Sequence, residues 1–260
     1  MTLTQIQAIA ADLAQLRLQV DLQLAPVYPH FAGKPYPLGR CTEIRDGMFL
    51  QLQAQLPHSR QPGLALLKQQ LDSGAVLKKA WGSLRDEYFQ SAMLLGEWYI
   101  DVANDTVHAN KPRVEILPLA SSGFSAITSF AQFVKIARPY WQVEIYRNDV
   151  CPALAPLMPL LCVGKDNVSW LSVANDDMLA LAMHSQFGAS EVILTALPPP
   201  PKAIALRWQS ALQQLAANDF LHGHGNALDY CQDYREKQRH FDTAFRDRAV
   251  LAYAQLPKMI

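Results

Sequence analysis

A cysteine stands at the start of a predicted helix in the N-terminal part of the chain. Residues 36–44 form a Pro/Gly loop that leads to Cys41, and apolar residues then recur every four positions from Ile44, as on one helix face. A helix N-terminus carries about half a positive charge, and the adjacent Arg40 adds a full one, so both favour thiolate over thiol. Cys41 is therefore a candidate nucleophile. The alternative is a small buried side chain that packs the helix start.

A predicted β-hairpin follows this helix in the sequence. Its strands are expected over Phe89–Leu95 and Trp98–Val102, with Gly96-Glu97 at the turn. Asp101 lies near the end of the second strand, and Gln90 stands eleven residues before it. The hairpin thus supplies one carboxylate and one amide that could act together with a thiol.

This order of residues resembles the transglutaminase-like branch of the papain-like thiol enzymes. In that branch a Cys opens a helix after a Gly-containing loop, a His starts one strand, and an Asp ends the next strand about eleven residues later. Residues 90–101 have this length, with Gln90 at the position of the His. The resemblance covers residues 36–106 and implies an α+β fold with an antiparallel sheet, in which Cys41 is the nucleophile and Asp101 the orienting carboxylate.

Gln90 is a departure from the family pattern with a chemical consequence. A glutamine amide neither takes the thiol proton nor returns it to a leaving amine, although it can polarise a substrate by donating a hydrogen bond. His108, seven residues after Asp101, and His30, in the loop before Cys41, are the candidate replacement bases. For both, the alternative is a solvated loop histidine. For Asp101 and its polar neighbours, Asn104 and Asp105, the alternative is a turn that satisfies local backbone donors.

Two functions from different classes follow. The first is a thiol-dependent amide hydrolase or acyl transferase that acts on a peptide or an amide-containing small molecule. The second is a catalytically silent protein of the same fold that serves as a binding or interaction module, with a protein partner docking on its C-terminal helices. The oligomeric state is left open in both.

The composition of the chain argues against two classes of partner, nucleic acids and membranes. The chain has 260 residues, half of them hydrophobic, with 23 basic and 23 acidic side chains and no basic run, so a nucleic-acid partner is not expected. No basic segment precedes the first apolar residues, which favours a cytoplasmic location. The uncharged stretch 150–164 is shorter than the roughly 18 residues of a membrane span and contains three prolines, so no membrane partner is expected.

No cofactor or metal is expected from the cysteines and histidines. The four cysteines form no CxxC pair, which predicts reduced thiols rather than disulfides or structural zinc. A second group with possible zinc ligands has none of the recognised spacings, and a flexible interhelical turn with surface histidines is the favoured explanation; its members are His222, His224, Cys231 and His240.

The domain plan is an α+β core over residues 1–197, a proline linker over 198–202 and a helical C-terminal segment over 203–260. Four consecutive prolines, 198–201, predict the stiff linker, and only helical patterns follow them. Within the core, we expect an opening helix through Ile9 and Leu16, strands at Val114–Leu117 and Val143–Tyr146, and a helix over 125–136 that ends before Pro139. A helix capped by Asn175 and a buried strand at Val192–Leu194 complete it.

Overall fold

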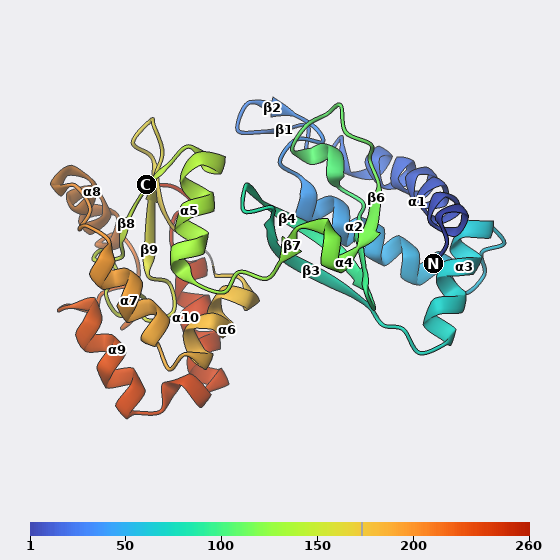
Figure 1. The fold of residues 1–260 in the computed structure, drawn as a ribbon. Coiled ribbons are helices and arrows are strands. Elements are labelled where there is room, and N and C mark those ends of the chain that lie inside the picture. Colours follow the sequence, from blue (N-terminus) through green and yellow to red (C-terminus); the bar gives the residue numbers. More distant parts are fainter. Residues whose placement is uncertain (173) are drawn as a thin grey trace. The chain divides into compact units, whose positions relative to one another are not determined.

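The structure is a computed structural model that describes residues 1–172 and 174–260 (Figure 1). It is a mixed helix and antiparallel-sheet protein, which confirms the predicted α+β class. The chain forms two compact units, Met1–Ala126 and Ile127–Ile260. Within the described residues, none of the helices has the length and apolar composition needed to cross a membrane.

Three helices build one side of the N-terminal unit. They are α1 (Leu3–Leu24), α2 (Cys41–Gln55) and α3 (Pro62–Asp72), and α1 packs on both of the others. The apolar residues that the periodicity placed on one face are buried, including Ile9 and Leu16 of α1. Helix α2 begins at Cys41, as predicted. Gly47 allows α1 and α2 to approach closely, because a Cβ at this position would lie 2.8 Å from Val20 Cγ1.

A five-stranded antiparallel sheet covers these helices in the N-terminal unit. Its strand order is β6-β5-β4-β3-β7, and α2 packs on β4. The predicted hairpin is confirmed, while β3 was not predicted because two lysines interrupt its apolar pattern. The strands are β3 (Leu77–Leu84), β4 (Tyr88–Leu95), β5 (Trp98–Asp101), β6 (Glu115–Pro118) and β7 (Phe124–Ser125).

Short elements complete the N-terminal unit. A two-stranded ribbon, β1 (His30–Phe31) with β2 (Lys34–Pro35), lies in the loop before Cys41. The 3-10 helix η1 (Asn104–Thr106) follows β5, and α4 (Leu119–Ser122) links β6 to β7. The backbone N–H of Gly39 donates to the carbonyl of Thr106 at 3.0 Å, so the loop before Cys41 is tied to η1.

The C-terminal unit has a three-stranded antiparallel sheet with helices around it. The strand order is β10-β9-β8. Its strands are β8 (Glu144–Arg147), β9 (Leu160–Val163) and β10 (Ser169–Ser172); its helices are α5 (Phe130–Trp141), α6 (Asp176–His184), α7 (Gly188–Ala196), α8 (Lys202–Leu212), α9 (Ala227–Glu236), η2 (Arg239–Phe241) and α10 (Thr243–Ala254).

Two local predictions for this unit are wrong. Helix α5 begins at Phe130, after its N-cap Ser129, and not at residue 125, and it continues through Pro139 to Trp141, because the proline falls in the last turn, where few further backbone hydrogen bonds are lost. The segment Val192–Leu194 belongs to helix α7 and is not a strand, since a run of three apolar residues does not distinguish the two structures. Asn175 does cap α6, accepting from the N–H of Met178 at 2.9 Å.

The chain divides into units at residues 126 and 127 and not at the proline run. The segment 203–260 belongs to the same unit as β8–β10, because it contributes core contacts to that sheet. Trp208 is buried and donates from Nε1 to Ser169 Oγ at 2.8 Å, and the backbone of Ile260 exchanges two hydrogen bonds with Ser169. The helices after the prolines are thus part of a folded core, and the Trp208 face is not open to a partner.

Candidate functional site

The thiol of Cys41 lies at the start of α2 against strand β4. Its surroundings are the hydroxyl of Thr42 and the backbone N–H and hydroxyl of Ser91, and these two hydroxyl oxygens are 2.9 Å apart. Burial raises the pKa of the Cys41 thiol, and the negative charge of Asp101 raises it further, while the hydrogen bonds from Ser91 and Thr42 offset this only in part. The surroundings of Cys41 therefore favour the neutral thiol and not the thiolate that the sequence predicted.

Arg40 does not direct its charge to the neighbouring thiol. Its guanidinium donates to Glu43 Oε1 at 2.7 Å and to the carbonyl oxygen of His30 at 2.6 Å. It also lies over the rings of Tyr28 and Phe31, 4.9 and 5.0 Å from their centroids. Arg40 thus fastens the β1–β2 ribbon to the start of α2, and its positive charge is balanced there.

Gln90 and Asp101 form a buried hydrogen-bonded pair. Gln90 Nε2 donates to Asp101 Oδ2 at 2.7 Å and to the carbonyl of Ala103 at 3.2 Å, so both amide hydrogens are used. Asp101 also accepts from the Tyr99 hydroxyl at 3.0 Å and from the N–H of Ala103 at 2.8 Å. Burial raises the pKa of Asp101 to about 6, and these hydrogen bonds oppose the rise. The predicted partnership between Gln90 and Asp101 is therefore present.

The pair lies on the sheet face that points away from Cys41. Ser91 meets Thr42 of α2, and the side chains of a strand alternate between faces, so Gln90 points to the opposite side. The pairing of β4 with β3 runs one to one across Gln90 without a bulge. Asp101 likewise follows Ile100, which packs in the helical core. The structure joins Gln90 to Asp101 on the face opposite Cys41, and no hydrogen bond among the described residues runs from Gln90 to the thiol, although the charge of Asp101 is near enough to raise the thiol pKa.

The two candidate bases are both exposed. His108 lies in the loop after η1, and His30 lies in strand β1. In the part of the chain that the structure describes, no hydrogen bond joins either imidazole to Cys41 or to Asp101. Neither histidine is therefore placed to act as a base for Cys41 or to be oriented by Asp101.

In the C-terminal unit, the structure places His222 in a set of backbone hydrogen bonds, whereas His240 Nδ1 is buried without a hydrogen-bond partner in the described residues. His222 is held by backbone groups, with Nδ1 3.1 Å from the Asn218 oxygen and Nε2 3.0 Å from the Leu212 oxygen. All four cysteines are free thiols, as predicted. Over residues 1–172 and 174–260, no three His, Cys, Asp or Glu side chains are grouped so that they could hold a metal ion.

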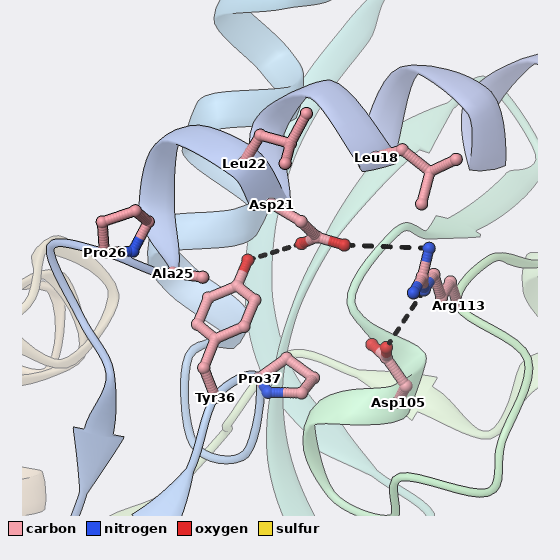
Figure 2. Close-up of a pocket in the computed structure, with 9 residues that line it drawn as sticks. All are labelled: Leu18, Asp21, Leu22, Ala25, Pro26, Tyr36, Pro37, Asp105 and Arg113. Atoms are coloured by element: carbon pink, nitrogen blue, oxygen red, sulfur yellow. Dashed lines mark hydrogen bonds and ion pairs between the residues drawn. The ribbon is translucent and has the colours of Figure 1, made fainter.

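A pocket that the sequence did not predict lies between α1 and the loops around it (Figure 2). Its volume is about 640 Å³, within the usual range for small-molecule sites. Aliphatic and ring carbons form most of the wall, and the polar groups converge on one side, where Figure 2 shows Arg113 between two carboxylates. The lining residues are Leu18, Asp21, Leu22, Ala25, Pro26, Tyr36, Pro37, Asp105 and Arg113.

A buried arginine organises the polar side of the pocket. Arg17 is 0% exposed and donates to Asp21 Oδ1 at 2.6 Å, to Asp105 Oδ1 at 3.1 Å and to the carbonyl of Val102 at 2.6 Å. The Tyr36 hydroxyl donates to Asp21 Oδ1 at 2.5 Å. The sequence did contain a signal for this ion pair. Arg17 interrupts the apolar face of α1 between Leu16 and Val20, and Asp21 follows it at the i,i+4 spacing of helical ion pairs.

Comparison of the chain with protein-family models, with curated proteins and with solved structures found no match in any of the three. The resemblance to transglutaminase-like enzymes therefore stays a prediction from the residues of the loop, helix and hairpin. Any assignment of function depends on the geometry of the sites themselves.

Proposed function

We propose that the N-terminal unit is a catalytically silent binding module of transglutaminase-like type, and that it holds its ligand in the pocket beside α1. The observation that carries this proposal is the direction of Gln90. Its amide hydrogens are used by Asp101 and Ala103, on the sheet face opposite Cys41, so the pair is a structural element of the sheet rather than part of a proton relay.

The state of the thiol supports the same conclusion. A nucleophilic cysteine needs a lowered pKa or an adjacent base. Burial instead raises the pKa of Cys41, and the two candidate bases, His30 and His108, are exposed and form no hydrogen bond with it in the described part of the chain. The pocket, in contrast, has the mixture of apolar wall and convergent polar groups that is typical of ligand sites.

The catalytic part of the proposal is tested with the wild-type protein and Cys41→Ala. Both are incubated with a panel of peptide amides and activated esters at pH 7 to 9, and release of product and the intact mass are followed. We expect identical background rates and no acyl adduct. Turnover or a covalent adduct that disappears in Cys41→Ala would overturn the proposal and restore the thiol-enzyme hypothesis.

The binding part is tested by filling the pocket. Ala25→Trp introduces an indole into the wall, while Gln23→Trp, on the same helix outside the lining, is the matched control. Saturation-transfer NMR with a mixture of small organic amines, acids and alcohols detects binding to wild type. We expect the signal to be lost in Ala25→Trp and kept in Gln23→Trp; equal signals from both variants would place the ligand elsewhere.

A further inference from the structure

The two carboxylates of the pocket each have one oxygen that is poorly paired. Their Oδ1 atoms accept short hydrogen bonds from Arg17. Asp21 Oδ2 is 3.9 Å from Arg113 Nη1, and Asp105 Oδ2 is 3.9 Å from Arg113 Nε and 3.5 Å from Arg17 Nη2. These separations exceed the usual N–H···O length of about 2.7–3.2 Å. Arg113 is thus an electrostatic partner of both acids without a close hydrogen bond to either.

The two arginines differ in how easily they can leave the acids. Arg17 is 0% exposed and held at three acceptors, whereas the Arg113 side chain is 45% exposed. The Asp21 and Asp105 side chains are 17% and 7% exposed, but Arg113 lies 3.9 Å from each of them without a close hydrogen bond, so it can turn into solvent by giving up only these two long contacts. Two carboxylates then face the pocket against the single charge of Arg17. The site left by Arg113 therefore has one negative charge in excess and matches a monocation.

The apolar lining of the pocket indicates which kind of molecule the cationic group belongs to. The pocket offers apolar surface next to the acids, as Figure 2 shows, from Leu18 and Leu22 of α1, from Ala25 directly after this helix, and from the rings of Pro26 and Pro37. Methylene groups bury favourably against such carbons, at about 0.8 kcal/mol each. An ammonium group on an alkyl stem satisfies both parts of the site.

We propose that this pocket binds an alkylammonium group, which takes the place of Arg113 between Asp21 and Asp105 while its stem lies on the apolar wall. This inference rests on the proposed binding function and names its ligand class. Arg113 is then an internal competitor of the ligand. A free alkylamine and the side chain of a lysine residue present the same chemistry.

The sign of the effect of Arg113→Ala tests the proposal. Hexylamine, hexanoate and hexanol share one stem and differ in charge, and their affinities are measured by NMR titration on wild type, Arg113→Ala and the exposed control Arg60→Ala. We expect hexylamine to bind best and Arg113→Ala to increase its affinity about fivefold, since one weak ion pair no longer competes. Arg60→Ala should leave the affinity unchanged.

The other possible results of the titrations decide between the inference, the proposed binding function and the source of the amine. If Arg113→Ala leaves hexylamine binding unchanged or weakens it, the inference is overturned. If hexanoate binds best and is lost in Arg113→Ala, Arg113 anchors an anion; the inference then fails while the proposed binding function stands. Amine binding that persists in Ala25→Trp contradicts both. A lysine source is supported if N-acetyl-lysine methylamide matches hexylamine, and a free amine if only hexylamine binds; both support the inference.

Discussion

Gln90 donates a 2.7 Å hydrogen bond to Asp101 on the sheet face that points away from the helix of Cys41. These two residues keep the spacing of a His/Asp pair of thiol enzymes, yet the amide hydrogens of Gln90 and the carboxylate of Asp101 are used by each other, Tyr99 and Ala103, while Gln90 Oε1 is buried without a hydrogen-bond partner among the residues that the structure describes. The chemistry of this face is therefore that of a buried carboxylate, which has measurable consequences for stability.

The stability of the protein should depend on pH through Asp101. Burial raises the pKa of Asp101 to about 6 in the folded protein, above the ordinary value of about 3.9, so the folded state binds more protons between these values. Its contribution is full below about pH 4 and is lost as the pH rises through about 6, by about 2–3 kcal/mol. Urea unfolding of wild type and Asp101→Asn from pH 4 to 8 measures this. A stability difference between them that does not fall with pH would contradict it.

Cys41 should alkylate slowly at neutral pH. Because burial raises the pKa of its thiol above the ordinary value of about 8.5, the reactive thiolate is scarce at pH 7. Iodoacetamide rates from pH 6 to 10, read by mass spectrometry, should be low at pH 7 and should still rise with pH beyond the ordinary thiol pKa of about 8.5, without levelling off below it. The buried Cys151, Cys162 and Cys231 serve as internal controls, and their pKa values are raised to about 12. A rate for Cys41 that levels off below pH 8 would show an activated thiol.

Replacing Arg17 should strongly destabilise the N-terminal unit. Arg17→Met leaves Asp21, Asp105 and the carbonyl of Val102 without their buried partner, and breaking such a pair costs about 3–5 kcal/mol. Urea denaturation gives the loss, and hydrogen exchange assigns it to residues 1–126. Arg60→Met, at an exposed position, should change stability by less than about 0.5 kcal/mol. Equal losses in the two variants would exclude a structural role for the buried arginine.

Two glycine-to-alanine substitutions should change the melting temperature in opposite directions. Alanine normally stabilises a helix relative to glycine by about 1 kcal/mol, but a Cβ at Gly47 would lie 2.8 Å from Val20 Cγ1, and this stiff buried side chain cannot move away easily. Gly47→Ala should therefore lower the melting temperature. Gly188 of α7 has no atom within 4 Å of such a Cβ, so Gly188→Ala should raise it. The same sign for both would contradict the close approach of α1 and α2.

Local elements with a strong apolar repeat or a clear boundary were predictable from the order of residues alone. The apolar spacing in α1 and α2, the Asn175 cap and the Gly96-Glu97 turn between β4 and β5 depend on near neighbours, and each was predictable. Where the local signal was short or mixed, as in Val192–Leu194 of α7 or in strand β3 with its lysines, the surrounding structure decided the outcome.

Contacts between side chains that are distant in the sequence depend on how the helices pack on the sheet. Gln90 and Asp101 could be paired from their spacing, but a one-residue shift changes the face of a strand, so the separation of Cys41 from them depends on how α2 packs on the sheet. The pKa of Cys41 depends on burial that no local pattern reports. The pocket joins Asp21 to Arg113 across 92 positions of the chain, which only the folded arrangement of α1 and the loops beside it brings together.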